Sequence, residues 1–238
     1  MTPPVSLIHQ DDTHRLIPTR HSNESVLRRL VSEPSESTVP STEDHLEALI
    51  DLESATNDRL LGEANLLPGI GVHELLFGVA HAQIVNAAFT HAHPSGSRFN
   101  SAGRGAWYAA FELKTAEAEV AFHKSEELRE VNWSEPETFV FEDFLADFRA
   151  EFHDLRGKSG NAEVLNPESY VRSQELAMSL LADASAGVVY PSVRRPEGTC
   201  IVCFRPALVH HVRKGQSVTM TFAAGQSTPV IRHGRRKP

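Results

Sequence analysis

Three residues whose types could do chemistry together stand close in the sequence. Arg98 precedes Tyr108 by ten positions and Glu119 follows Tyr108 by eleven, and glycines in the first interval let the backbone turn tightly. An arginine fork can bind a phosphate, a tyrosine ring can lie against an aromatic group, and a carboxylate can hold ribose hydroxyls or stabilise a developing cation. The set suits a nucleotide with an aromatic leaving group. The alternative is a surface arginine, a core tyrosine and a solvated glutamate.

The residue patterns around this set predict the elements that position it. "GAWYAAFEL", residues 105–113, combines aromatic and small residues as a strand does, and it would carry Tyr108. Residues 114–131 are rich in Ala, Glu and Leu, which favours a helix that would carry Glu119. Arg98 would then lie in a loop or at a strand edge that precedes both elements.

The remaining segments mix the two types of element. A helix is expected at 171–184, and a buried strand at 84–89 follows an apolar run with glycines. Further strands are predicted at 137–155, 186–195, 198–212 and 217–225. This mixed order with antiparallel neighbours predicts an α+β fold with mixed or antiparallel sheets and flanking helices.

Composition divides the chain into four parts. Residues 1–42 are rich in Ser, Thr, Pro and charge, which predicts a flexible N-terminal arm. A helical lead-in is expected over 43–84, with a helix at about 43–61. The main domain would span 85–225, and 226–238, which contains "RHGRRKP", would be a basic C-terminal tail.

Bulk composition argues against several classes of protein. The formal net charge of −8 disfavours direct nucleic-acid binding. No apolar run approaches the roughly 20 residues of a membrane span, and no secretory signal is visible. Cys200 and Cys203 suggest no disulfide framework, so a cytoplasmic location is expected. On a strand, their spacing would put the two cysteines on opposite faces.

Histidine pairs raise the question of a metal site. His91 with His93 and His210 with His211 are the obvious candidates among 13 histidines. The sequence has no H-E-x-x-H and no Cys/His quartet with zinc spacing, so no metal is predicted.

The stretch "SRFNSAGRGAWYAAFELKTAEAEVAFH" resembles the signature of the RES domain, a family named for its arginine, glutamate and serine. Members carry a G-R-W-N-like turn, then G-x-x-x-Y, then an alanine-rich helix with the glutamate. Arg98, Tyr108 and Glu119 fall on these positions, and Ser192 in "VVYPSVRRPEGTCIVCF" matches the serine. The resemblance covers about residues 85–215, which would make 85–225 a RES catalytic domain.

This resemblance implies a fold like that of diphtheria-toxin-like ADP-ribosyltransferases and an enzyme that consumes NAD+ as substrate, with no separate cofactor. It implies a toxin of a toxin–antitoxin pair whose partner is an Xre-type antitoxin. The activity would be that of an NAD+ phosphorylase or NAD+ glycohydrolase, with phosphate or water as acceptor. Homo-oligomers and hetero-oligomers with the antitoxin both fit.

The resemblance also assigns expected roles. Glu119 would stabilise the cation that forms when nicotinamide leaves, and Tyr108 would stack on nicotinamide. Arg98 would hold the pyrophosphate or orient the ribose side. Ser192 would orient the ribose or the carboxylate. Asn100, next to the arginine turn, would contribute to NAD+ binding.

Basic and imidazole groups near these positions have two interpretations each. Arg194 and Arg195 could bind the phosphate or form a solvated basic turn. His123, four residues after Glu119 on one helix face, could tune that carboxylate or simply pack.

The chain departs from the family pattern in three ways. Phe99 replaces the usual Trp. Many short members carry a Y-R pair on the first strand, whereas the matching stretch here would be "AAFTH", without arginine. The first 60 or so residues have no counterpart in short members.

Three other functions stay open. A protein ADP-ribosyltransferase on the same fold would transfer ADP-ribose to a macromolecule. A non-enzymatic interaction module would keep the fold without activity. A metal-dependent hydrolase would be sensitive to chelators.

Overall fold

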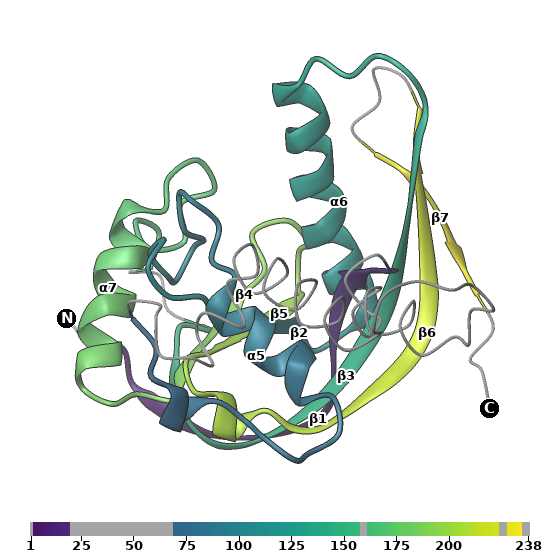
Figure 1. The fold of residues 1–238 in the computed structure, drawn as a ribbon. Coiled ribbons are helices and arrows are strands. Elements are labelled where there is room, and N and C mark those ends of the chain that lie inside the picture. Colours follow the sequence, from purple (N-terminus) through teal and green to yellow (C-terminus); the bar gives the residue numbers. More distant parts are fainter. Residues whose placement is uncertain (1, 20–68, 158–160, 224–227, 235–238) are drawn as a thin grey trace, which may run out of the picture.

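A computed structural model describes residues 2–19, 69–157, 161–223 and 228–234. Its backbone combines seven strands in one sheet with three α-helices among the described residues (Figure 1). The helix predicted at 43–61 lies outside the described residues. None of the helices in the described ranges is long and apolar enough to cross a membrane.

The sheet is mostly antiparallel and closes partly on itself. Its strands, in chain order, are β1 (Val5–Pro18), β2 (Trp107–Ala110), β3 (Glu137–Asp154), β4 (Gly187–Pro191), β5 (Thr199–Cys203), β6 (His210–Phe222) and β7 (Val230–His233). The order across the sheet is β1-β2-β5-β4-β3-β6-β7, and an additional β1–β3 pairing joins the first five strands into a closed ring. Among the strand pairs of the described residues, β3 with β4 is the only parallel one. The predicted α+β fold is therefore confirmed.

Helices cover both faces of this sheet. They are α5 (Ala82–Thr90), α6 (Leu113–Glu130) and α7 (Val171–Ala182), with 3₁₀ turns at Val72–Glu74 and Pro206–Leu208. Figure 1 shows α6 standing alongside the long strands β3 and β6, with α7 on the other side of the molecule. Buried side chains of α5 belong to one apolar cluster, and those of α6 and α7 belong to a second.

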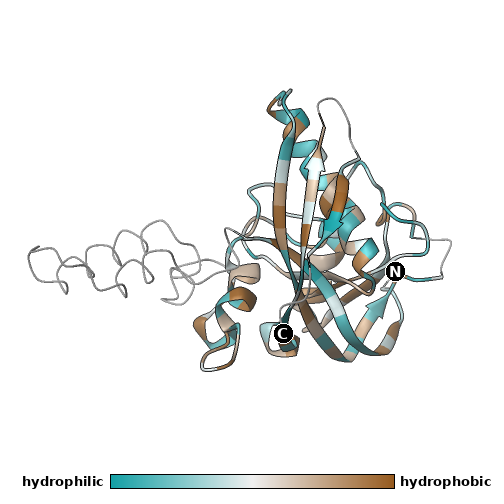
Figure 2. Ribbon diagram, turned by 90° about the vertical axis from the view of Figure 1, so that its right-hand side faces the viewer, coloured by the Kyte–Doolittle hydropathy of each residue, from teal (hydrophilic) through white to brown (hydrophobic). Residues whose placement is uncertain are grey.

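The strands separate these two clusters because their side chains alternate between the faces. In Figure 2, brown and teal segments alternate along the long strands. Phe144, Phe148 and Phe152 lie at even spacing on β3 and are fully buried in the α5 cluster. These phenylalanines therefore form part of the core on the α5 face.

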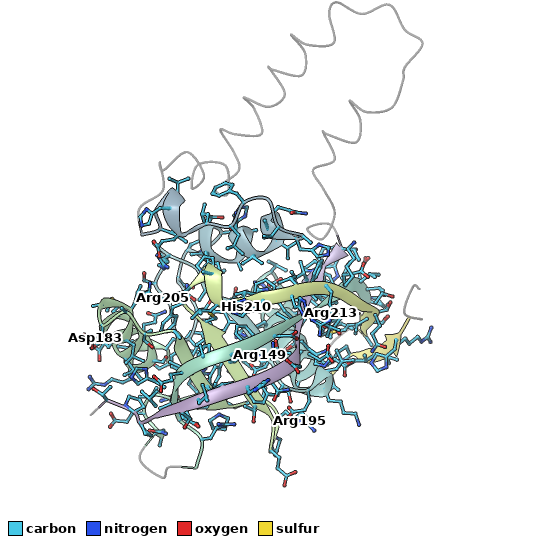
Figure 3. All side chains as sticks on the ribbon, turned by 90° about the horizontal axis from the view of Figure 1, so that it is seen from below. Arg149, Asp183, Arg195, Arg205, His210 and Arg213 are labelled. Carbon is cyan, nitrogen blue, oxygen red and sulfur yellow. The ribbon has the colours of Figure 1, made fainter. Side chains whose placement is uncertain are left out.

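The expectation of a flexible arm is wrong for Val5–Pro18, which forms β1 and pairs with β3 along its length. Composition misled because cross-strand polar contacts, as well as apolar burial, stabilise this strand. Arg149 on β3 donates to Asp11 at 2.7 Å, and Arg213 on β6 donates to Asp12 (both arginines are labelled in Figure 3). Residues 20–42 lie outside the described residues.

The prediction of a basic C-terminal tail is also wrong in part. Val230–His233 forms β7 and pairs with the end of β6. His233 donates from Nε2 to Oε1 of Glu117 on α6 at 2.6 Å. Its strand is therefore attached to the sheet by backbone pairing and to α6 by a side chain.

The predicted strand at 84–89 is instead part of α5. A short apolar run fits a buried helix as well as a buried strand, so periodicity could not separate the two. The polar group in this run is satisfied, because the side chain of Asn86 accepts from the Leu76 amide and donates to the Leu76 carbonyl, each at 2.9 Å.

Candidate functional site

A tight turn before β2 contains two of the predicted residues. Tyr108 on β2 donates its hydroxyl to Oδ1 of Asn100 at 2.8 Å and accepts the Phe99 amide at 2.9 Å. Gly96 sits in the turn with φ +70°, where an added Cβ would lie 2.3 Å from the Asn100 carbonyl oxygen. Burial raises the pKa of Tyr108, so its phenol stays protonated at neutral pH and can donate. The tyrosine hydroxyl therefore stabilises the turn that carries Arg98.

Arg98 is buried and holds a loop that precedes α7. Its Nη1 donates to the carbonyl oxygen of Asn166 at 2.8 Å, and its guanidinium carbon lies 4.6 Å from the ring centroid of Tyr170. A phosphate that binds this arginine would compete with the Asn166 carbonyl and the Tyr170 ring for the guanidinium.

The predicted carboxylate and serine are in direct contact. The Oγ of Ser192, just after β4, donates to Oε1 of Glu119 on α6 at 2.6 Å. The backbone amides of Arg194 and Arg195 donate to the same Oγ at 3.1 and 3.0 Å. With its acceptor sites occupied by two amides and its proton directed at the carboxylate, the serine orients Glu119.

Arg194 and Arg195 leave this turn in different directions. Arg194 donates from Nη2 to the Pro167 carbonyl at 2.9 Å, and its guanidinium carbon lies 3.3 Å from the ring centroid of Phe122 on α6. Arg195 donates from Nη1 to Oγ1 of Thr115 at 2.9 Å. Arg194 and Arg98 thus bind adjacent carbonyls of one loop.

The pKa values of two further residues, Tyr190 and His123, are shifted by several of the predicted site residues. Burial raises the pKa of Tyr190, and so do Cys200, Glu119 and Tyr108, while Arg98 opposes them. Partial removal from water lowers the pKa of His123, with Glu119 opposing and Arg194 and Arg98 adding to the effect. A buried tyrosine that the sequence did not single out therefore lies among the expected site residues.

Sequence reasoning also missed Arg15. Its Nη1 donates to the Tyr108 carbonyl at 3.0 Å, and burial lowers the pKa of Arg15 to about 10. Its Nε has no hydrogen-bond partner among the described residues. The expectation that "AAFTH" lies on a strand is wrong, because that stretch is at the end of α5, whereas Arg15 lies on β1. Because the composition of residues 1–42 predicts a flexible arm, the sequence does not single out Arg15 as a site residue.

The histidine pairs do not gather metal ligands. Within the described ranges, no group of three or more His, Cys, Asp or Glu side chains is arranged to hold a metal ion. His93 bonds Ser95 through Nδ1 at 2.7 Å, and His211 bonds Asp147 at 3.2 Å.

The site thus combines one oriented carboxylate with guanidinium groups of opposite charge. Glu119 offers negative charge that could stabilise a cation, and Arg98 and Arg194 could bind an anion if the loop carbonyls released them. Asn100 and Tyr108 shape the turn. Among the described residues, neither forms a hydrogen bond with Glu119 or Ser192.

Comparison with known proteins identifies a family and solved structures with distant similarity. The family model described as the RES domain matches residues 75–223. The crystal structure of the M. tuberculosis MbcT–MbcA toxin–antitoxin complex is similar at a TM-score of 0.43 and 11% sequence identity, over 91% of this chain and 87% of that chain. No curated protein matches. The family match begins ten residues before the expected domain start at 85 and covers more than half of the chain. The chain belongs to the RES-domain family.

Proposed function

We propose that this protein degrades NAD+ by breaking the bond between nicotinamide and C1′ of the ribose, with phosphate or water as acceptor. The observation that supports this most is the 2.6 Å hydrogen bond from Ser192 to Glu119. It holds a carboxylate on α6 beside the turn that carries Arg194, and Glu119 and Arg98 both influence the pKa values of Tyr190 and His123. Membership of the RES-domain family supports the same reaction class.

In the proposed reaction, the electron pair of the C1′–nitrogen bond leaves with nicotinamide, and C1′ becomes oxocarbenium-like. Glu119 stabilises this positive charge, an effect worth on the order of 3–4 kcal/mol for one well-placed group. The oxygen of phosphate or water then bonds to C1′, and its proton goes to solvent. The products are nicotinamide with either a phosphorylated ADP-ribose or ADP-ribose.

The arginines would bind the diphosphate of the substrate. Arg98 and Arg194 now donate to the neighbouring Asn166 and Pro167 carbonyls, so two guanidinium groups lie within reach of one segment. A diphosphate offers stronger acceptors than backbone carbonyls and would compete for both. Asn100 and Tyr108 would support this binding through the turn that positions Arg98.

We also propose that the protein acts as the toxin of a toxin–antitoxin pair. RES-domain proteins are typically such toxins, and the expected partner is an Xre-type antitoxin that closes the active site. Loss of cellular NAD+ would then slow growth when the protein is produced without that partner.

The experiment is a timed incubation of purified protein with NAD+, with and without phosphate, followed by chromatography of the products. A phosphorylated ADP-ribose that appears only with phosphate would mean a phosphorylase, and ADP-ribose in both reactions would mean a glycohydrolase. A parallel reaction with labelled NAD+ and cell extract detects transfer to protein. Label on protein would favour the ADP-ribosyltransferase, and NAD+ unchanged throughout would overturn the proposal.

A further inference from the structure

Cys200 is a side chain in the site to which the proposed reaction gives no role. Its Sγ lies 3.7 Å from Oε1 of Glu119, and the residue is only 3% exposed. Ser192 donates to the same Oε1. In the described part of the chain, both contacts go to Oε1 and none is found to Oε2, so the two oxygens of the carboxylate have different surroundings.

The register of the sheet explains how this thiol reaches the carboxylate. Cys200 on β5 lies opposite Tyr190 on β4 and opposite Ala110 on β2. Its side chain belongs to the apolar cluster on the α6 face, together with the small Ala116 of that helix. Small residues on the neighbouring strand and on the helix leave space for the sulfur to approach Glu119.

The other cysteine provides a built-in comparison. Cys203 lies three residues later on the same strand, is fully buried and belongs to the cluster on the opposite face. Its Sγ contacts the Arg205 carbonyl at 3.2 Å. The two thiols therefore share strand, burial and chemistry, but only Cys200 contacts Glu119.

Protonation decides what the thiol can do there. Burial and the nearby Glu119 carboxylate raise the pKa of Cys200 well above its usual value. The group is a neutral thiol at neutral pH, so it can donate its proton to a carboxylate oxygen and does not repel it. A protonated, buried thiol is a poor nucleophile, which argues against a covalent role.

We infer that Cys200 is a positioning residue that acts with Ser192 to hold Oε1 of Glu119, so that Oε2 is turned toward the ribose. This inference rests on the proposed NAD+ cleavage. A carboxylate that accepts a single hydrogen bond at Oε1 can still rotate about that hydrogen bond. Two donors that approach Oε1 from different directions prevent this rotation. The orientation affects charge stabilisation in the transition state more than it affects binding of the ground state.

The test measures initial rates of nicotinamide release by the full chain across NAD+ concentrations. Cys200→Ala and Cys200→Val both remove the donor, and the valine fills most of the space. We expect each to lower kcat by roughly 3- to 10-fold, the effect of one modest hydrogen bond, with KM within about twofold of the wild type. Cys200→Ser keeps a donor and should stay within about twofold of wild-type kcat.

Cys203→Ala is the matched control, and thermal unfolding gives the folded fraction of every variant. Cys203→Ala should keep the wild-type kcat per folded molecule, even if its Tm changes. Wild-type kcat in both Cys200→Ala and Cys200→Val would overturn the inference, as would an equal loss in Cys203→Ala or in Cys200→Ser. If Cys200→Ala fails to fold, the kcat of Cys200→Val is compared with that of Cys200→Ser. The inference then requires a loss of kcat in the valine variant alone. No nicotinamide release by the wild type would overturn the proposed function itself, an outcome distinct from any variant effect.

Discussion

Ser192 has the contacts of an orienting residue. Its oxygen accepts the amides of Arg194 and Arg195 and donates to Oε1 of Glu119, so its lone pairs and its proton are all engaged. A hydroxyl used in this way would have to lose its contacts before it could attack a substrate. Its effect on the reaction should therefore be transmitted through Glu119.

Removing this hydroxyl should reduce turnover. We expect Ser192→Ala to lower kcat about 10- to 100-fold, because a hydrogen bond to a charged group contributes roughly 1.5–3 kcal/mol. The measurement is the rate of nicotinamide release at saturating NAD+. Ser179→Ala, at an exposed serine on α7, is the control and should match the wild type. Wild-type turnover by Ser192→Ala would mean that the serine does not orient a catalytic group.

At the scale of elements, the loop before α7 is attached to the site by two guanidinium groups. Arg98 binds the Asn166 carbonyl from the turn before β2, and Arg194 binds the Pro167 carbonyl from the turn after β4. Tyr170 adds its ring against Arg98. The loop therefore occupies guanidinium groups that the proposed substrate would need, and under the proposed function these two contacts would give way to the diphosphate.

Loss of one of these contacts should loosen the loop. Arg194→Ala removes the hydrogen bond to Pro167 and the contact with Phe122. We expect amide hydrogen exchange over 161–170 to become at least about threefold faster, since even one weak hydrogen bond contributes about 0.5–1.5 kcal/mol. Arg129→Ala is the control, because its exposed side chain bonds Glu126 within α6, away from this loop. Equal exchange in wild type and Arg194→Ala would show that the loop keeps its position without this arginine.

For the whole molecule, closure of the sheet depends on β1. This strand pairs with β3 along its length and with β2 at His14 and Ala110, which completes the ring of five strands. It also carries Arg15 to the carbonyl of Tyr108. A segment that composition marks as dispensable is thus part of the scaffold that positions the site.

Substitutions at two neighbouring residues of β1 can show whether this segment stabilises the fold or behaves as a flexible arm. Ile8 is 4% exposed and Leu7 is 76% exposed. We expect Ile8→Ala to lower the free energy of unfolding by about 2–4 kcal/mol and Leu7→Ala by less than about 0.5 kcal/mol. Urea titration of both variants measures the difference. If Ile8→Ala is as neutral as Leu7→Ala, β1 does not contribute to the core.

Acid stability should depend on Asp147, which connects β3 with β1 and β6. Burial alone would raise the pKa of Asp147, but hydrogen bonds from the Asp12 amide and from Arg213 and His211 outweigh it and lower the pKa. The folded pKa thus lies below the unfolded value of about 4, so this contribution to stability is complete above that value and is lost as pH falls through the folded pKa.

The measurement is the free energy of unfolding of wild type and Asp147→Asn between pH 3 and 7. The variant should be less stable at pH 7, and the difference should shrink as the pH falls below the unfolded value of about 4, because the unfolded state of the wild type then takes up a proton at this aspartate. Asp183→Asn, at the exposed aspartate labelled in Figure 3, should follow the wild-type curve. A difference that stays constant with pH would contradict the role given to Asp147.

Sequence alone predicted the elements with strong local patterns and the residues with a family motif. The helix that carries Glu119 and the strand that carries Tyr108 were predicted because propensity and composition agree there. β1 was missed because polar cross-strand pairs are long-range and leave no local pattern. For the same reason the sequence does not single out Arg15 and Tyr190, which strand pairing and burial bring to the candidate site.

The central claim is that Glu119, oriented by Ser192, stabilises the cation formed when nicotinamide leaves NAD+. The most direct test compares nicotinamide release by wild type and Glu119→Gln, which keeps size and removes charge. The claim predicts that the wild type releases nicotinamide and that Glu119→Gln lowers kcat by about 100- to 1,000-fold, with its Tm near that of the wild type. Near-full NAD+ cleavage by folded Glu119→Gln would contradict it.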